Sequence, residues 1–510
     1  MKRLTDLEYL KLNKFKKLLY KLKCFFVGIP VWFLGIFKGI GKFFAKIGLG
    51  IKDGCVDIYL TFKNGDWKTR LSFVIMGFGS FARGQTLRGI LFLGFELAFI
   101  VYMIFGGAHW LSLLPSLGKV PPQVNVYDPE LDVNVNIPAP DPSFKILLYG
   151  VLTILFFLTL IYTWRLNVKQ NKISEEILKK GKKIKSNKED IESALDDQFH
   201  KTLLALPTIG VVVFTLLPIL FMILIAFTNF DAQHDGRNNN LFTWIGLTNF
   251  NQLLGWSSDG TSFSATFGEI LTWTLMWAFF ATFSNYFLGM FVAMMINKKG
   301  IKLKKVWRTI LVMTIAIPQF ISLMYVSKMF AKNGIINNLL ESWHIISKPI
   351  EFWDNKNLAR VTVILINIWI GIPYLMLITT GILMNIPQDL YESAKIDGAN
   401  AFQQYTKITL PYVLFVTAPY LLTSFIGNIN NFNVIYLLTG GKPDNAASMK
   451  SGAPAGHTDL LITWLFKLTT QDSNYKLAAV IGIIVFIVVS IISVIVYNII
   501  PSTKNEEDFS

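Results

Sequence analysis

The stretch YESAKIDGANAFQQYTKITLP, residues 391–411, is polar although strongly apolar segments flank it on both sides. Its first part, together with the residues just before it, predicts a short helix over residues 389–396. This helix starts after Pro387, because the fixed φ of proline and its missing N–H suit the beginning of a helix. Gly398 follows, and a glycine permits the backbone to turn there.

A second, amphipathic helix is predicted over residues 401–410. Phe402, Tyr405 and Ile408 recur every three residues, which places them along one face of a helix. Pro411 is expected to close this helix, because proline cannot continue the backbone hydrogen bonding. The two helical pieces and the glycine between them form a compact polar element, called the knob below.

The rest of the chain is strongly apolar. Of its 510 residues, 52% are hydrophobic and 16% are charged, so a water-soluble multidomain protein is not expected. We expect an all-α integral membrane protein with about eight transmembrane helices of about 20 residues each. The corresponding apolar runs lie at about 90–110, 146–164, 203–227, 270–296, 309–330, 361–384, 412–438 and 477–500.

Lysine and arginine mark one side of the predicted membrane. About 17 lie in residues 1–89, about ten in 165–201 and about six in 298–308, whereas 228–268 holds only Arg237. The positive-inside rule then places both termini and the knob in the cytoplasm. The net charge of +15 is explained by this topology and by anionic lipid headgroups. Nucleic-acid binding is the weaker alternative, since the chain has no basic domain interspersed with aromatic residues.

The chain is expected to have a modular organisation. Residues 1–23 predict a Lys-rich helix on the inner leaflet, and 25–51 predict an interfacial segment, with a re-entrant hairpin as the alternative. Glu96 lies in the first predicted crossing, and we expect a packing role for it because an unpaired carboxylate is costly there. The expected domains are a cytoplasmic and interfacial amphipathic region at 1–89, two crossings with a cytoplasmic linker at 90–200, a six-helix transport domain at 201–500 with the knob at 385–411, and a cytoplasmic tail at 501–510.

The sequence contains no catalytic machinery. It lacks the G-x-x-x-x-G-K-[ST] phosphate-binding loop, so this chain is not expected to hydrolyse ATP. Its five histidines have neither zinc-binding nor triad spacing. Cys24 and Cys55 are the only cysteines, and they have no metal-binding spacing. We therefore expect no catalytic residue, no metal site and no cofactor bound by this chain.

Polar side chains gather in the seventh predicted crossing, in SFIGNINNFNVIYLL. On a helix Ser424, Asn428 and Asn431 share one face. Carboxamides inside a bilayer need partners, and their donors and acceptors match sugar hydroxyls. Hydrogen bonding from helix to helix without a ligand is the equally weighted alternative.

The sixth predicted crossing has a second polar face, in WIGIPYLML. Gly371 and Pro373 weaken the helix there, and broken helices near the middle of a membrane often mark transport sites. Tyr374 offers a ring that can stack on a sugar and a hydroxyl that can bond to it, whereas a tyrosine at the membrane interface is the alternative.

The knob resembles the cytoplasmic coupling motif of binding-protein-dependent ABC import permeases, which reads roughly E-A-A, D-G-A, an aromatic residue, and I-x-L-P. Ser393 replaces one alanine and keeps the side chain small. Residues from about 200 to 500 resemble the MalF-type membrane subunit of maltose and maltodextrin importers at WIGIPY, IPQDLYESAKIDGA, KITLP, NNF, LLTGGKPD and AGHTDLL. The matched knob positions are Glu392, Ser393, Ala394, Asp397, Gly398, Ala399, Phe402, Ile408, Leu410 and Pro411.

This resemblance implies an ABC type I importer permease core and a set of sugar-contacting residues. Gly427 stands where the maltose type can carry an aromatic residue, and Ile315 in TIAIPQF stands where it can carry a tyrosine, so the resemblance implies a wider or differently tuned pocket. The implied substrate-binding residues are Ile370, Gly371, Tyr374, Ser424, Gly427, Asn428 and Asn431.

The resemblance also implies partners. These are a second homologous permease, two copies of a cytoplasmic ATPase that hydrolyses ATP, and an extracellular sugar-binding protein. This protein would dock on the Gly- and Pro-rich loop at 439–476, for which a plain connector is the alternative. An oligosaccharide is the expected substrate, and membrane lipids surround the helices. An importer of the same family for galacto-oligosaccharides or a polyol is the close alternative. A non-ABC transporter or a membrane glycosyltransferase is the distant one.

Overall fold

The structure is a computed structural model, and it divides the chain into two compact units. Unit 1 comprises Met1–Leu111 and Val151–Ile209, and unit 2 comprises Ser112–Gly150 and Gly210–Ser510. The expectations for residues 1–23, and most of those for 25–51, lie outside the residues that the structure describes. The described residues are isolated positions between 39 and 46, and then 48–118, 125–128, 133–136, 141–236, 240–255, 261–298, 300–450 and 453–499.

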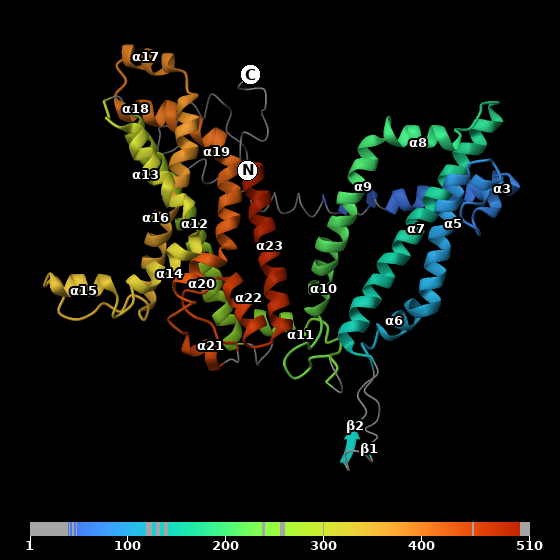
Figure 1. Ribbon diagram of the computed structural model, residues 1–510, viewed down its shortest axis with the longest axis horizontal. Coiled ribbons are helices and arrows are strands. Elements are labelled where there is room, and N and C mark those ends of the chain that lie inside the picture. Colours follow the sequence, from blue (N-terminus) through green and yellow to red (C-terminus); the bar gives the residue numbers. More distant parts are fainter. Residues whose placement is uncertain are drawn as a thin grey trace, which may run out of the picture. The chain divides into compact units, whose positions relative to one another are not determined.

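Unit 1 is built from helices (Figure 1). Aromatic side chains join two of the longest, because the Phe156 ring lies 5.3 Å from that of Phe99 and 5.4 Å from that of Phe95, in edge-to-face arrangements that aromatic rings favour. The elements with assigned bounds are α3 (Trp67–Leu71), α4 (Phe78–Phe81), α5 (Thr86–Tyr102), the π-helical turn η1 (Met103–Gly107), α6 (Ala108–Leu113), α7 (Ser143–Lys179), α8 (Asn187–Leu195) and α9 (Phe199–Val211), of which α6, α7 and α9 extend into unit 2.

The centre of unit 1 is polar. The Arg83 side chain, only 1% exposed, lies 2.7 Å from the Asp66 carboxylate and donates a hydrogen bond of 2.8 Å to Asn171. A buried guanidinium requires such partners, since an unpaired buried charge is strongly destabilising. Glu96 accepts a hydrogen bond of 2.8 Å from the backbone N–H of Met76, in agreement with the packing role expected for it.

Unit 2 contains the knob and the longest series of helices (Figure 1). Two short antiparallel strands, β1 (Asn125–Asp128) and β2 (Val133–Asn136), pair with Asn125 opposite Asn136. The helices are η2 (Val212–Leu216), α10 (Leu217–Ile225), α11 (Thr248–Leu254), α12 (Thr261–Asn297), α13 (Lys304–Ala316), α14 (Gln319–Met329), α15 (Ile335–Ser342), α16 (Lys356–Met384), α17 (Gln388–Ile396), α18 (Ala401–Gln404), η3 (Tyr405–Thr409), α19 (Leu410–Ile429), α20 (Phe432–Leu438), α21 (Ala446–Lys450), α22 (Leu461–Thr470) and α23 (Tyr475–Ile499).

The described chain has seven helices that are long and apolar enough to cross a membrane, or eight crossings if the bent pair α13–α14 counts as one. This agrees with the expected number, but two predicted crossings are not straight helices. The run at 309–330 bends by 91° between α13 and α14, at Ile317 and Pro318. The run at 412–438 is interrupted after Ile429, and α20 begins at Phe432.

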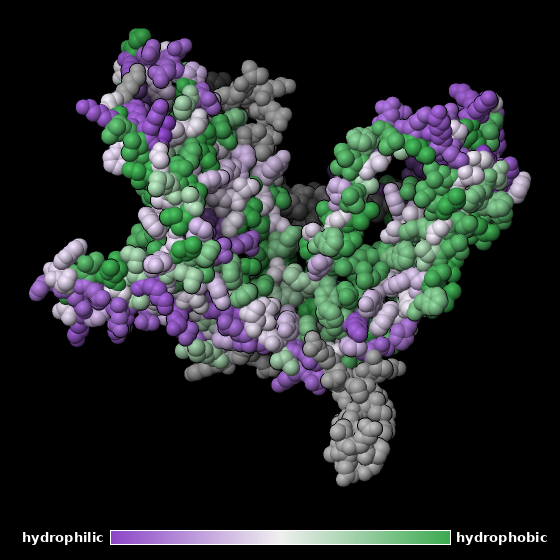
Figure 2. Space-filling view, in the orientation of Figure 1, coloured by the Kyte–Doolittle hydropathy of each residue, from purple (hydrophilic) through white to green (hydrophobic). Residues whose placement is uncertain are grey.

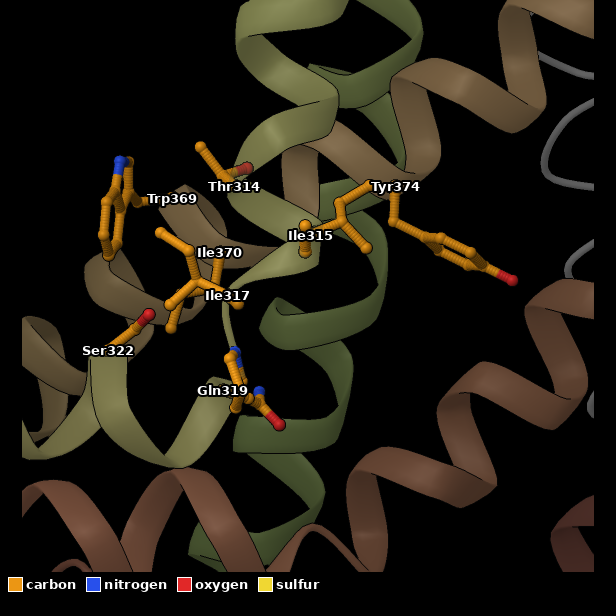
Figure 3. Close-up of a pocket in the computed structure, with 10 residues that line it drawn as sticks. Thr314, Ile315, Ile317, Gln319, Ser322, Trp369, Ile370 and Tyr374 are labelled. Atoms are coloured by element: carbon orange, nitrogen blue, oxygen red, sulfur yellow. The ribbon is translucent and has the colours of Figure 1, made fainter.

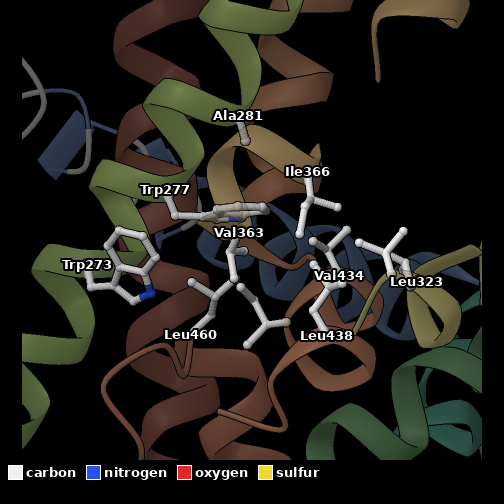
Figure 4. Close-up of a cluster of buried hydrophobic side chains, with 11 residues drawn as sticks. Trp273, Trp277, Ala281, Leu323, Val363, Ile366, Val434, Leu438 and Leu460 are labelled. Atoms are coloured by element: carbon white, nitrogen blue, oxygen red, sulfur yellow. The ribbon is translucent and has the colours of Figure 1, made fainter. Parts of the chain in front are cut away.

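The hydrophobic core of unit 2 lies between α12, α14, α16, α20 and the residues just before α22 (Figure 4). Trp273 and Trp277 of α12 are almost fully buried in it. Their indole N–H groups donate hydrogen bonds of 3.1 Å to the carbonyl oxygens of Thr458 and Asn428, respectively. Truncating a core tryptophan typically costs about 3–5 kcal/mol. These two side chains therefore fix both the loop that precedes α22 and the end of α19.

Hydrophobic residues cover the sides of the unit 2 helices in Figure 2, and hydrophilic residues gather around α17–α18 at one end and around α15 and α21 at the other. At the latter end, the Glu269 carboxylate lies 2.7 Å from Lys356, 3.1 Å from Arg360 and 2.8 Å from His457. These contacts tie the loop after α20, predicted to face outward, to α12 and α16.

Candidate functional site

A cavity lies at the elbow where α13 meets α14. Proline at position 318 has no N–H to donate, so the helix cannot continue its hydrogen bonding through the elbow. The cavity has a volume of about 360 Å³, at the small end of the usual range for ligand pockets. Its lining residues are Thr314, Ile315, Ala316, Ile317, Pro318, Gln319, Ser322, Trp369, Ile370 and Tyr374.

Two of the seven expected sugar-contacting residues, Ile370 and Tyr374, line this cavity. Figure 3 shows Ile370 beside Trp369 and Ile317, with the Tyr374 ring directed the other way. That ring faces Tyr420 of α19, at 6.3 Å between centroids. Tyr374 therefore lies between the elbow cavity and α19, the helix that carries Ser424, Gly427 and Asn428.

The elbow also supplies residues that sequence reasoning did not select. Thr314, Gln319 and Ser322 provide hydroxyl and amide groups to the cavity, and Trp369 provides a second ring. Ile315, which marked a departure from the maltose type, lines the same cavity. The signal available in the sequence was the proline inside an apolar run, because a broken membrane helix exposes polar backbone groups where it lines a cavity.

The carboxamides of Asn428 and Asn431 are partly occupied by protein partners. Asn428 Nδ2 donates to Thr282 Oγ1 at 3.0 Å, which joins α19 to α12. Asn431 Nδ2 donates to Asn428 Oδ1 at 3.3 Å, and Asn431 Oδ1 accepts from the backbone N–H of Val434 at 3.3 Å. Asn431 is thus the N-cap of α20. The expectation that it shares a continuous helical face with Ser424 and Asn428 is wrong, because α19 ends at Ile429.

Gly371 has a packing function that the resemblance did not imply. A β-carbon there would lie 2.3 Å from Asn285 Nδ2 of α12, so a larger residue at this position would have to displace the Asn285 side chain. The Asn285 side-chain oxygen and the Asn367 side-chain nitrogen are both buried without a hydrogen-bond partner. Gly427 differs, because nothing lies within 4 Å of a β-carbon built on it. The space that an aromatic residue would fill is open at that position.

The knob has the two helical pieces and the glycine turn that the sequence predicts. Helix α17 spans Gln388–Ile396, Gly398 has φ +75°, and α18 begins at Ala401. The Asn400 side chain accepts from Gln403 N at 2.8 Å, and the Gln403 side chain accepts from Asn400 N at 2.9 Å. This reciprocal capping box stabilises the start of the second piece.

Two details of the second piece differ from expectation. Pro411 does not close it, since α18, the π-helical turn η3 and α19 form one span from Ala401 to Ile429. A π-helical turn contains an extra residue, so it accommodates the missing N–H of a proline that follows. Phe402 does not share the buried face with Tyr405 and Ile408, because its side chain is 72% exposed.

Among the described residues, one side of the knob packs against the membrane helices. Tyr391, Tyr405 and Ile408 pack against a cluster that includes Tyr286 and Met290 of α12, and the Tyr391 hydroxyl lies 2.9 Å from Thr409 Oγ1. On the outer side Ile396 is 87% exposed. The residues of the expected coupling set that are exposed there are Glu392, Ser393, Asp397, Gly398 and Phe402, whereas Ala394 and Ala399 are partly buried.

Comparison of the sequence with known proteins identifies the family of this chain. Residues 285–504, which include the knob, match the model of the binding-protein-dependent transport system inner membrane component. The maltodextrin transport system permease protein MalC of Streptococcus pneumoniae is 32% identical, over 84% of this chain and 95% of that protein.

Two Bacillus subtilis proteins match to a similar extent. The maltodextrin transport system permease protein MdxF is 32% identical over 86% of this chain and 97% of that protein. The galactooligosaccharides transport system permease protein GanP is 31% identical over 85% of this chain and 97% of that protein. With this coverage, and with seven or more apolar helices long enough to cross a membrane among the described residues, the chain belongs to the binding-protein-dependent family of multi-pass permease subunits of ABC importers.

Proposed function

We propose that this chain forms half of the translocation pathway of an ATP-driven importer for maltose or maltodextrins. The observation that carries the proposal is the elbow cavity lined by Ile370 and Tyr374, which combines aromatic rings with hydroxyl and amide groups. Rings stack on the apolar faces of sugars, and hydroxyl and amide groups bond to sugar hydroxyls. The names of two relatives, both maltodextrin permeases, support this substrate class.

Under this proposal, the chain works with a second homologous permease, two copies of a cytoplasmic ATPase and an extracellular sugar-binding protein. Its termini and knob face the cytoplasm, and the loop at 439–476 faces outward. The chain itself binds no cofactor, and ATP is hydrolysed by the partner ATPase. Sugar enters between the permeases, and access alternates as the ATPase opens and closes.

The exposed side of the knob fits a protein partner. Ile396 and Phe402 are large apolar residues left uncovered next to Glu392 and Asp397, and exposed apolar residues with a polar rim mark interaction sites. Because α18 continues through η3 into α19, a displacement of the knob is passed along a helix of 29 residues. Such a helix is about 40 Å long at 1.5 Å per residue.

Import by the reconstituted complex in liposomes tests the sugar site. Tyr374→Ala and Asn428→Ala should each raise the maltotriose concentration for half-maximal import about two- to tenfold, because each loses one hydrogen bond of about 0.5–1.5 kcal/mol. Both variants should still bind the ATPase. Tyr325→Ala is the matched control, because Tyr325 is an exposed tyrosine of α14 outside the cavity. Unchanged kinetics in both site variants would remove the proposed site.

The second candidate function is import of galacto-oligosaccharides, which the similarity to GanP favours. A sugar panel separates the two candidates. ATPase activity of the complete transporter should rise with maltodextrins and should not respond to galacto-oligosaccharides. The opposite response would transfer the assignment to the second candidate.

A further inference from the structure

A cationic turn joins α12 to α13 at the end of the membrane helices where the knob lies. It spans residues 298–308 and contains Lys298, Lys302 and Lys305, all exposed. No aspartate or glutamate occurs between positions 270 and 340 of the sequence, so the turn has no acidic neighbour along the chain. In the described part of unit 2, the lysines that form ion pairs are others: Lys332, Lys356, Lys467 and Lys476.

Exposed apolar side chains alternate with these lysines. Leu303 is 71% exposed and Trp307 is 54% exposed, and Ile301 is also exposed. The apolar surface continues along α13 at Ile310 and Met313. A chain segment at the membrane–water interface typically has lysine ammonium groups in the water, with apolar residues and a tryptophan beside them.

Two other basic residues of the turn, Lys304 and Arg308, hold it against the neighbouring helices. Lys304 Nζ donates to the backbone oxygen of Asn297 at 3.0 Å, and the Arg308 guanidinium donates to the Asn297 side-chain oxygen. Asn297 Nδ2 in turn donates to Thr380 Oγ1 of α16 at 3.2 Å. Lys304 and Arg308 therefore fix the turn to α12 and α16, while the ammonium groups of Lys298, Lys302 and Lys305 have no protein partner that the structure describes.

We infer that the cationic turn binds the headgroups of anionic phospholipids. Phosphate oxygens satisfy Lys298, Lys302 and Lys305, while the acyl chains cover Trp307 and the apolar face of α13. A soluble acidic partner would satisfy the charges but would leave the apolar residues between them exposed to water. Each lysine near an anionic membrane surface contributes about 1 kcal/mol, which is about a fivefold preference for anionic over zwitterionic lipid.

Trp307 provides a local reporter for this inference. The transporter is placed in nanodiscs of phosphatidylcholine with a minor fraction of phosphatidylglycerol, and bromine is carried on the acyl chains of one lipid or the other. Subtracting the quenching of Trp307→Phe isolates the signal of this one tryptophan. Quenching by brominated phosphatidylglycerol should correspond to about fivefold enrichment over its bulk fraction. The enrichment should disappear at about 1 M salt, where the screening length is about 3 Å.

Three variants decide the outcome. K298Q/K302Q/K305Q should return the quenching to the bulk value, and K298R/K302R/K305R should retain the enrichment because the charge is kept. K180Q/K182Q/K183Q, which removes three exposed lysines elsewhere, should leave it unchanged. Equal quenching by both brominated lipids in the parent protein would overturn the inference.

Two further results would also overturn it. If inorganic phosphate reduced the enrichment more than chloride of equal ionic strength, the turn would bind free phosphate and not a lipid. If K298Q/K302Q/K305Q lost a co-purifying protein chain and the parent showed no lipid preference, the turn would bind an acidic protein partner.

Discussion

Substitution of Gly371 separates two possible functions of this residue. The family resemblance assigns Gly371 to sugar contact, whereas the structure assigns it to helix packing. Substitution by alanine would place a methyl group 2.3 Å from Asn285 Nδ2 and 2.6 Å from Asn285 Cγ. Neither helix can withdraw easily, since a second close approach of the same two helices brings a β-carbon on Gly289 within 2.6 Å of Leu375 Cβ. Overpacking of this kind costs about 1–3 kcal/mol.

Gly371→Ala should therefore lower the thermal midpoint of the purified transporter in detergent. At about 2.1 cal/mol/K per residue, each kcal/mol lowers the midpoint of a chain of 510 residues by about 1 °C, so a fall of about 1–3 °C is expected. The double variant Gly371→Ala with Asn285→Ala should recover the midpoint, because the amide that the methyl group meets is gone. Gly381→Ala is the matched control on the same helix: no atom lies within 4 Å of its β-carbon, so stability should hold or rise.

Sugar-stimulated ATPase activity is measured on the same variants, together with the thermal midpoint. If packing is the whole function of Gly371, activity recovers together with the midpoint in the double variant. Recovery of the midpoint without recovery of activity would refute the packing argument, because it would show that the sugar itself needs the bare backbone at Gly371. A fully stable Gly371→Ala single variant would refute the geometry on which the argument rests.

Two other substitutions test the knob and the loop before α11. Gly398→Asp should keep the permease folded, because aspartate tolerates φ +75°. The variant should nevertheless lose the bound ATPase. Normal co-purification of the ATPase and normal sugar uptake would contradict docking at the knob. Burial raises the Asp231 pKa, but hydrogen bonds from Lys476 and His234 outweigh it and lower the pKa to about 2. Asp231→Asn should then cost about 2 kcal/mol at pH 7. Because the folded-state pKa is depressed, this difference should persist above about pH 5 and vanish toward pH 2; a difference independent of pH would rule out the ion pair.

The crossings and the knob were predictable because each depends on local sequence. A run of about 20 apolar residues is enough to identify a membrane helix, and Pro387 and Gly398 mark the start of α17 and the turn after it. Membership of the permease family also excludes the distant alternatives of a non-ABC transporter and a glycosyltransferase, which composition alone left open.

The bends were not predictable from the same patterns. Pro318 breaks its helix by 91°, whereas Pro411 lies in a continuous helical span after a π-helical turn. Both prolines stand in apolar surroundings, and which of the two outcomes follows depends on the packing of neighbouring helices. The expected sugar contacts were affected for the same reason, because the end of α19 at Ile429 turns Asn431 into a helix cap.

The polar centre of unit 1 also escaped prediction, because its partners are distant in sequence. Arg83 meets Asn171 across 88 positions, and Thr69 donates to Glu175 at 2.8 Å across 106. No local periodicity connects such residues. Only the fold brings these guanidinium, carboxamide and carboxylate groups together at one buried point, where they hydrogen-bond to one another.

The position of the knob suggests how a movement there reaches the cavity. Helix α16 ends at Met384 and α17 begins at Gln388, while α18 continues into α19. The knob thus connects two helices that also meet where Tyr374 faces Tyr420 at 6.3 Å. If the knob tilts, we expect the angle between α16 and α19 to change, and with it the separation of these two rings. Because Tyr374 lines the elbow cavity, the proposed ATPase cycle would open or close the cavity without any contact between ATPase and sugar site.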